Sequence, residues 1–179
     1  MGNRKQETNR LPTRTKASMS DFPREFSVET APQPTHYTLA DDYYVVLGAG
    51  ADQADLNVEF HIEDGDLTVC RKRHGETSLA APATAAGPVY RLGEHGPLAV
   101  PTGKVFVRFT EQTKLEDRQE DIERTGFMVN QILSYAPHAG WIEPKSGKIV
   151  DAINRFEELK YIPGVAAVEP QMLMESQRR

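Results

Sequence analysis

From residue 104 onward the chain alternates strand-like and helix-like segments, and this order constrains its fold more than any other feature. The run 104–109 is rich in Val and Phe, which favour strands, and the polar stretch 113–124 favours a helix that Gly126 ends. The expected elements are strands at 104–109, 127–133, 141–143 and 165–169, and helices at 113–124 and 149–159. The order β-α-β-β-α-β is typical of a ferredoxin-like domain, with two helices on one face of a four-stranded antiparallel sheet. We therefore predict an α+β protein whose ferredoxin-like domain spans 103–174.

A small, β-rich antiparallel module is expected upstream, at 36–100. Apolar and polar side chains alternate from 54 to 62, and the turn residues 63–66 lead into a second strand-like run at 67–71, which predicts a β-hairpin. The segment 78–88 is rich in Ala, Pro, Thr and Gly and is typical of a loop. This module therefore precedes the predicted ferredoxin-like domain along the chain.

The two ends of the chain lack the patterns of folded elements. Residues 1–33 are expected to be a disordered leader, because they are polar and have no apolar periodicity, and 175–179 to be a flexible tail. The net charge is +4 over residues 1–24 and −9 over the remainder, so a basic docking arm is the alternative. No apolar stretch of signal-peptide or transmembrane length occurs, and Gln6 does not fit an N-myristoylation motif. We expect a cytoplasmic protein.

The charge and the cysteine content exclude several function classes. The 179 residues carry 21 Lys and Arg against 26 Asp and Glu, a formal net charge of −5 with a pI near 5.6. Such a chain is a poor match for the phosphates of nucleic acid or for an anionic membrane, so neither is an expected partner. A single cysteine, Cys70, excludes an internal disulfide and a thiolate-rich metal site, and it fits a reducing compartment.

No motif in the sequence carries the chemistry of an enzyme. The strand-like run 43–47 and the glycines of 48–50 resemble the start of a dinucleotide fold, but Gln53 stands where a third small residue is needed. The five histidines lack the i, i+4 spacing of a zinc-protease helix, and Cys70 and His74 lack an orienting acid. We expect no catalytic residue, no metal and no cofactor; a small enzyme that uses Cys70 or the histidines is the alternative.

Several short motifs of the C-terminal half belong together in one known family. They are the strand 105–109, the segment 139–142, the helix end 156–159 and the run Pro-Gly-Val-Ala-Ala-Val-Glu-Pro at 163–170. With them, residues 89–174 resemble the propeptide, or inhibitor, domain of subtilisin-like serine proteases, where a run like 163–170 closes the fold and leads into the protease. No Asp, His or Ser protease motif follows before Arg179. The resemblance thus implies a free-standing propeptide-like protein that acts in trans.

The resemblance also implies which residues meet a partner. In the family, the open face of the sheet packs on two surface helices of the protease, and the extended C-terminal tail lies in the substrate cleft. Alternation along 104–109 puts Phe106 and Arg108 on one face, and this face meets the partner if the helices cover the other. Trp141 is a further candidate on the sheet, with a place in the core as the alternative.

The tail candidates follow the last predicted strand. They are Met172, Leu173, Met174 and Glu175. An extended segment gains affinity from backbone hydrogen bonds and specificity from alternate side chains. The alternative is that the apolar residues of this tail pack back on the sheet.

These observations predict a non-catalytic protein-binding module. The first hypothesis is an inhibitor or folding chaperone of a subtilisin-like protease, which uses the sheet face and the tail. The second is an adaptor or structural subunit of an intracellular complex that uses the same sheet for an unrelated protein. In both, the expected partner is a protein.

Overall fold

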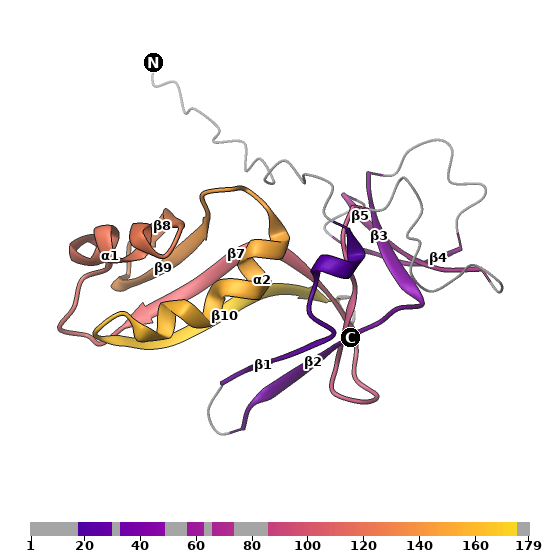
Figure 1. The fold of residues 1–179 in the computed structure, drawn as a ribbon, viewed down its shortest axis with the longest axis horizontal. Coiled ribbons are helices and arrows are strands. Elements are labelled where there is room, and N and C mark those ends of the chain that lie inside the picture. Colours follow the sequence, from indigo (N-terminus) through magenta and orange to yellow (C-terminus); the bar gives the residue numbers. More distant parts are fainter. Residues whose placement is uncertain (1–17, 30–32, 49–56, 63–65, 74–85, 175–179) are drawn as a thin grey trace, which may run out of the picture.

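Antiparallel strands dominate the structure, a computed structural model that describes residues 18–29, 33–48, 57–62, 66–73 and 86–174 (Figure 1). The strands are β1 (Glu25–Val28), β2 (Thr35–Leu39), β3 (Tyr43–Leu47), β4 (Val58–Ile62), β5 (Leu67–Arg71), β6 (Tyr90–Leu92), β7 (Leu98–Phe109), β8 (Phe127–Leu133), β9 (Ala136–Pro144) and β10 (Val165–Met174). The helices are η1 (Met19–Asp21), η4 (Leu115–Arg118), α1 (Gln119–Arg124), α2 (Ile149–Arg155) and η5 (Phe156–Tyr161), where η marks 3₁₀ turns. No helix within the described ranges is long and apolar enough to cross a membrane.

The main sheet is built around β7. One path through it has the order β1-β2-β6-β7-β9-β8, and β10 pairs with the other edge of β7. All of these pairs are antiparallel, and the six-strand path curls into a half-barrel. In Figure 1, α2 lies in front of β7 and β10, against which it packs together with η5. The strands β3, β5 and β4 form a separate small sheet, in that order.

Strand β7 serves two parts of the sheet because it continues through a bend at Gly103. Its C-terminal half pairs with β9, and its first residues, Leu98 and Ala99, pair with β6. Gly103 has a φ of +92°, which residues with a Cβ rarely adopt, and a Cβ there would lie 3.2 Å from Cγ1 of Ile149 in α2. On the opposite edge, β10 shifts its register between Pro170 and Met172. Irregularities of this kind increase the local bend of paired strands, which accounts for the curl.

The predicted ferredoxin-like arrangement of 103–174 is wrong for this chain. The protein is mostly β, with a curled six-strand path, a small three-stranded sheet and two short helices. The reason is the length of β7, which begins at Leu98 instead of residue 104 and pairs there with β6. Through β6, strands β2 and β1 join the same sheet, so the later strands do not stand alone as a four-stranded layer.

The residues before β7 are also divided differently from the prediction. The expected module 36–100 is split, since β2 and β6 belong to the main sheet while β3, β4 and β5 form the small one. The hairpin prediction is confirmed by the antiparallel pairing of β4 with β5. Within the leader expected to be disordered, η1 and β1 form between residues 19 and 28. Residues 1–17, most of the hairpin turn (63–65), most of the expected loop (78–85) and the tail 175–179 lie outside the described residues.

One hydrophobic core joins the helices to the two ends of the main sheet. From β7 it takes Val105, Val107 and Phe109, which are at most 1% exposed. Phe26 of β1 stacks on Tyr37 of β2, with ring centroids 5.0 Å apart, and meets Tyr90 of β6 and Phe156 of η5 edge-on at 5.0 and 5.9 Å. Such aromatic contacts contribute beyond simple area burial, so β1, β2, β6 and η5 form one packing unit.

Stability at alkaline pH tests the burial of two tyrosines in this core. Burial raises the pKa of Tyr90, and burial followed by the charge of Glu169 raises the pKa of Tyr37. The unfolded chain then loses these protons first, so this stability is complete below the ordinary tyrosine pKa of about 10 and falls as the pH rises above it. We expect Tyr90→Phe to reduce the alkaline loss of unfolding free energy.

The same substitution removes the hydrogen bond that the Tyr90 hydroxyl donates to the Pro23 carbonyl at 2.9 Å, at a cost of about 1 kcal/mol at neutral pH. Urea unfolding at neutral pH and above the ordinary tyrosine pKa measures both effects. Tyr161→Phe is the control, since Tyr161 is 87% exposed. An alkaline loss of equal size in Tyr90→Phe and the control would contradict the burial of Tyr90.

Candidate functional site

The side of the main sheet that faces away from the helices presents a row of side chains. We call this side of β8, β9, β7 and β10 the open face. Phe106 of β7 lies opposite both Trp141 of β9 and Glu169 of β10, and Gln131 of β8 lies opposite Trp141. Residues directly opposite in antiparallel strands point to the same side, so one row of side chains crosses all four strands. The next residue of β7, Val107, is fully buried on the helix side.

Phe106 and Trp141 form an aromatic pair in the middle of this row. Their ring centroids are 5.4 Å apart with an interplanar angle of 62°, an edge-to-face contact. Both side chains are half-buried, and Arg108 is exposed opposite the small side chains of Ala139 and Ala167. The predicted alternation along β7 therefore agrees with the burial pattern, and Trp141 lies on the open face instead of in the core.

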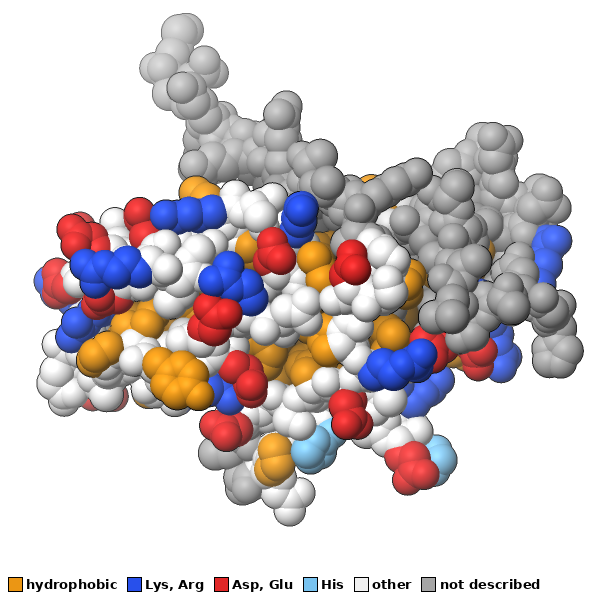
Figure 2. Space-filling view, in the orientation of Figure 1, with side chains coloured by type: hydrophobic (Ala, Val, Ile, Leu, Met, Phe, Trp, Pro, Cys, Tyr) orange, Lys and Arg blue, Asp and Glu red, His pale blue; other side chains and the backbone are white. Residues whose placement is uncertain are grey.

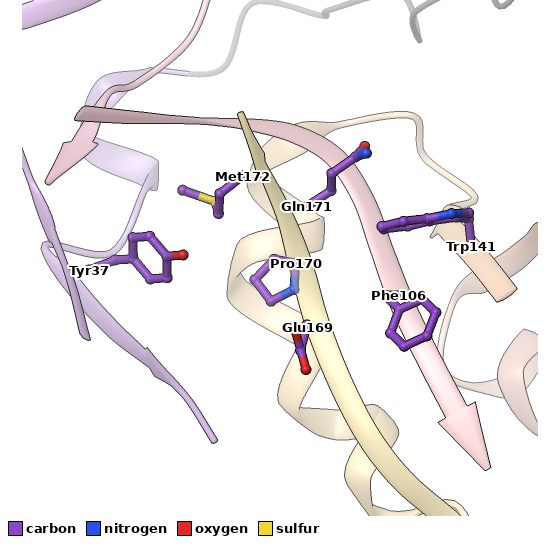
Figure 3. A pocket seen from close by; sticks show the side chains of 7 residues that line it. All are labelled: Tyr37, Phe106, Trp141, Glu169, Pro170, Gln171 and Met172. Atoms are coloured by element: carbon purple, nitrogen blue, oxygen red, sulfur yellow. The ribbon is translucent and has the colours of Figure 1, made fainter. Parts of the chain in front are cut away.

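A groove lies beside the aromatic pair, at the register shift of β10 (Figure 3). It has a volume of about 300 Å³ and is lined by Tyr37, Phe106, Trp141, Glu169, Pro170, Gln171 and Met172. Figure 3 shows Phe106 and Trp141 on one side of β10, and Tyr37 and Met172 on the other. The groove therefore depends on strands β2, β7, β9 and β10, which are far apart in the sequence.

Glu169 is the charged residue among those that line the groove. Within the described part of the chain, no basic side chain forms an ion pair with it. Burial and the Glu169 charge hold the pKa of Tyr37 above its usual value, so this phenol stays protonated at neutral pH. Gln171 Oε1 accepts a hydrogen bond of 2.8 Å from Thr102 Oγ1, which orients the amide. The groove thus combines aromatic surface, a fixed amide and a carboxylate, a set of groups suited to binding.

The predicted tail residues are part of the sheet. Met172, Leu173 and Met174 continue β10 and pair with Pro101, Val100 and Ala99 of β7. All three are half-buried: Met172 and Met174 pack against the core of the main sheet, and Leu173 packs against a second cluster of buried side chains around the small sheet. The structure thus has the alternative arrangement, in which these residues pack back on the sheet, and their binding in a partner's cleft stays a prediction. Glu175 lies outside the described residues.

The residues considered for catalysis do not assemble within the described ranges. Cys70 is fully buried on β5, and burial raises the pKa of its thiol, which disfavours the reactive thiolate. His61 contacts the Thr68 hydroxyl at 2.9 Å, a local pair between β4 and β5. No cluster of three His, Cys, Asp or Glu that could hold a metal occurs in the part of the chain that is described. His74 and residues 49–56 lie outside it.

The groove includes residues that sequence reasoning did not find. Glu169 was within the recognised run 163–170, and alternation with the buried Val168 could have placed it on the open face. Tyr37 gave no such signal, because its position beside β10 depends on the curl of the sheet. Gln171 follows Pro170, and because proline often ends a strand, the sequence predicts that the last strand stops before Gln171.

Comparisons with protein-family models, with curated proteins and with solved structures found no match to this chain. The resemblance to subtilase propeptides stays a prediction, supported by the sequence motifs alone.

Proposed function

We propose that this chain is a non-catalytic protein-binding module that docks a partner protein on its open face. The aromatic pair Phe106 and Trp141 carries the proposal, because two large rings stay partly exposed on a face that the chain's own helices do not cover. Aromatic residues and arginine are the side chains that most often dominate binding energy at protein interfaces. Arg108 adds an exposed guanidinium on the same face.

The sequence motifs favour a subtilisin-like serine protease as the partner, with the chain acting in trans as inhibitor or folding chaperone. In this mechanism the sheet face makes the contact, and Met172, Leu173 and Met174 stabilise the sheet from within β10. An adaptor or structural subunit is the second candidate. The pairing of Met172–Met174 favours it, since no extended product-like segment occurs among the described residues after β10 begins.

The substitution Phe106→Glu tests the open face. Placing a carboxylate beside Trp141 should weaken partner binding at least tenfold, since it removes an aromatic contact and adds a charge that must be desolvated. Tyr161→Glu is the control, because it places the same carboxylate at an exposed aromatic residue that lies at the end of η5, away from the open face. The first measurement is the inhibition constant of the full chain against a purified subtilisin.

Two results would change the proposal in different ways. If the wild-type chain does not inhibit or help to refold the protease, the inhibitor and chaperone functions are excluded. Quantitative capture from the native extract then tests the adaptor function, which predicts a protein retained by wild type and Tyr161→Glu but lost by Phe106→Glu. A partner retained equally by all three proteins would overturn docking on the open face.

A further inference from the structure

We infer that the groove on the open face seats a basic side chain of the partner protein, for which arginine is the best fit. This inference rests on the proposed function and adds the chemistry that the face recognises. The observations that carry it are the row of side chains across β9, β7 and β10, and the charge of Glu169.

The row brings a carboxylate and two aromatic rings within reach of one side chain. Glu169 and Trp141 lie opposite Phe106 from its two neighbouring strands, so Phe106 stands between them. Opposite residues in antiparallel strands have Cβ atoms about 4.5–5.5 Å apart, so the row from Glu169 to Trp141 spans about 10 Å. A guanidinium over the Phe106 ring would thus contact aromatic surface and the Glu169 carboxylate together. A planar guanidinium suits both contacts, by stacking on a ring and by paired hydrogen bonds to a carboxylate.

The charge of the groove favours a cation. Glu169 lies in a lining that is otherwise neutral, since Tyr37 keeps its proton and Gln171 is an amide held by Thr102. A partly buried carboxylate gains most from a charged hydrogen-bond partner, and none pairs with Glu169 in the described part of the chain.

Several acidic groups on the helix side of the molecule are paired with basic residues of the chain. Figure 2 shows Lys and Arg side chains among those of Asp and Glu on the side that carries α2 and η5. Glu158 pairs there with Arg155 at 3.0 Å and Glu157 with Lys160 at 3.2 Å. Lys104 and Arg108, which lie two residues before and after Phe106 on the same face of β7, do not line the groove, and among the described residues neither forms an ion pair with Glu169. Glu169 is therefore a site where a basic group from another molecule finds a partner.

Trp141 provides a direct readout, because it is the single tryptophan of the chain. Its indole N–H gives one resonance in a proton–nitrogen correlation spectrum. The probe is the blocked peptide acetyl-Gly-Arg-Gly-amide, and the same peptide with Gln in place of Arg is the uncharged control. We expect the arginine peptide to shift the Trp141 resonance in a saturable way, with at least fivefold higher affinity than the glutamine peptide.

The substitution Glu169→Gln should lower the affinity for the arginine peptide at least fivefold. Glu143→Gln is the matched control, because Glu143 lies opposite Met128 on the open face, two residues from Trp141 and outside the groove lining. It should change the affinity less than twofold. Equal binding of both peptides, or equal loss in both variants, would overturn the inference.

The chain's own leader is the competing occupant, since residues 1–17 contain five basic residues and one acidic residue. Replacing Arg4, Lys5, Arg10, Arg14 and Lys16 with Gln in the full chain tests it. A shift of the Trp141 resonance in this variant without peptide would assign the groove to the leader and overturn the inference. If the arginine peptide fails to bind while Phe106→Glu still removes the partner, the basic-side-chain inference is wrong and the proposed function stands.

Discussion

Replacing Phe156 with alanine should lower the free energy of unfolding by about 3–5 kcal/mol. Phe156 is 1% exposed at the start of η5, and its ring meets Phe26 of β1 at 5.9 Å. Phe26 in turn contacts Tyr37 and Tyr90, so the substitution opens a cavity between the helices and the strands β1, β2 and β6. The loss is large because rings that interlock from several elements do not collapse readily into the space.

Urea unfolding followed by far-ultraviolet circular dichroism and by Trp141 fluorescence measures this effect. Because β1, β2 and β6 share one core with the helices, both signals should shift together in Phe156→Ala. Phe60→Ala is the control, since Phe60 is half-buried on β4 of the small sheet and its replacement should cost only about 1–2 kcal/mol. A loss below that of Phe60→Ala would mean that the aromatic cluster does not link these elements.

Local patterns predicted the elements better than their assembly. Alternation located the hairpin β4/β5, and a polar helix-forming stretch located the helical turns before β8. Apolar residues at helical spacing located the helical turns before β10. The assembly depended on β7, whose first half contains Pro101 and Gly103. These residues normally interrupt strands, so the sequence placed the start of the strand at Lys104. The pairing of Leu98 and Ala99 with β6 is decided by contacts between segments distant in the chain, which no local pattern encodes.

The candidate site, too, could be predicted only in part from local sequence patterns. The twofold repeat of β7 was enough to put Phe106 and Arg108 on one face, because side-chain direction in a strand is local. The groove also needs Glu169 opposite Phe106, and Tyr37 beside β10, and both depend on register and curl. Hence the faces of Phe106 and Glu169 could be predicted from the sequence, whereas the position of Glu169 opposite Phe106 and the shape of the groove could not.

Two truncations of the C-terminus, one that removes residues 172–179 and one that removes only 175–179, should differ sharply in stability. Removing residues 172–179 should lower the free energy of unfolding by about 2–4 kcal/mol, because each of the three lost half-buried apolar side chains gives about half of the roughly 1.5–3 kcal/mol of a fully buried one. The cut also removes the pairing of Met172, Leu173 and Met174 with β7. Removing only 175–179 keeps all of β10 and should change the unfolding free energy by less than about 0.5 kcal/mol.

Urea unfolding of both truncated chains and of wild type tests whether Met172, Leu173 and Met174 stabilise the sheet. Equal stability of the two truncations would contradict the pairing in β10 and return Met172–Met174 to the role of a tail that occupies a partner's cleft. If only the longer truncation is destabilised, its effect on a partner follows from the loss of the sheet, because Met172 also lines the groove beside Phe106 and Trp141. Partner binding by the shorter truncation then isolates the open face, since that chain keeps every groove residue and every strand.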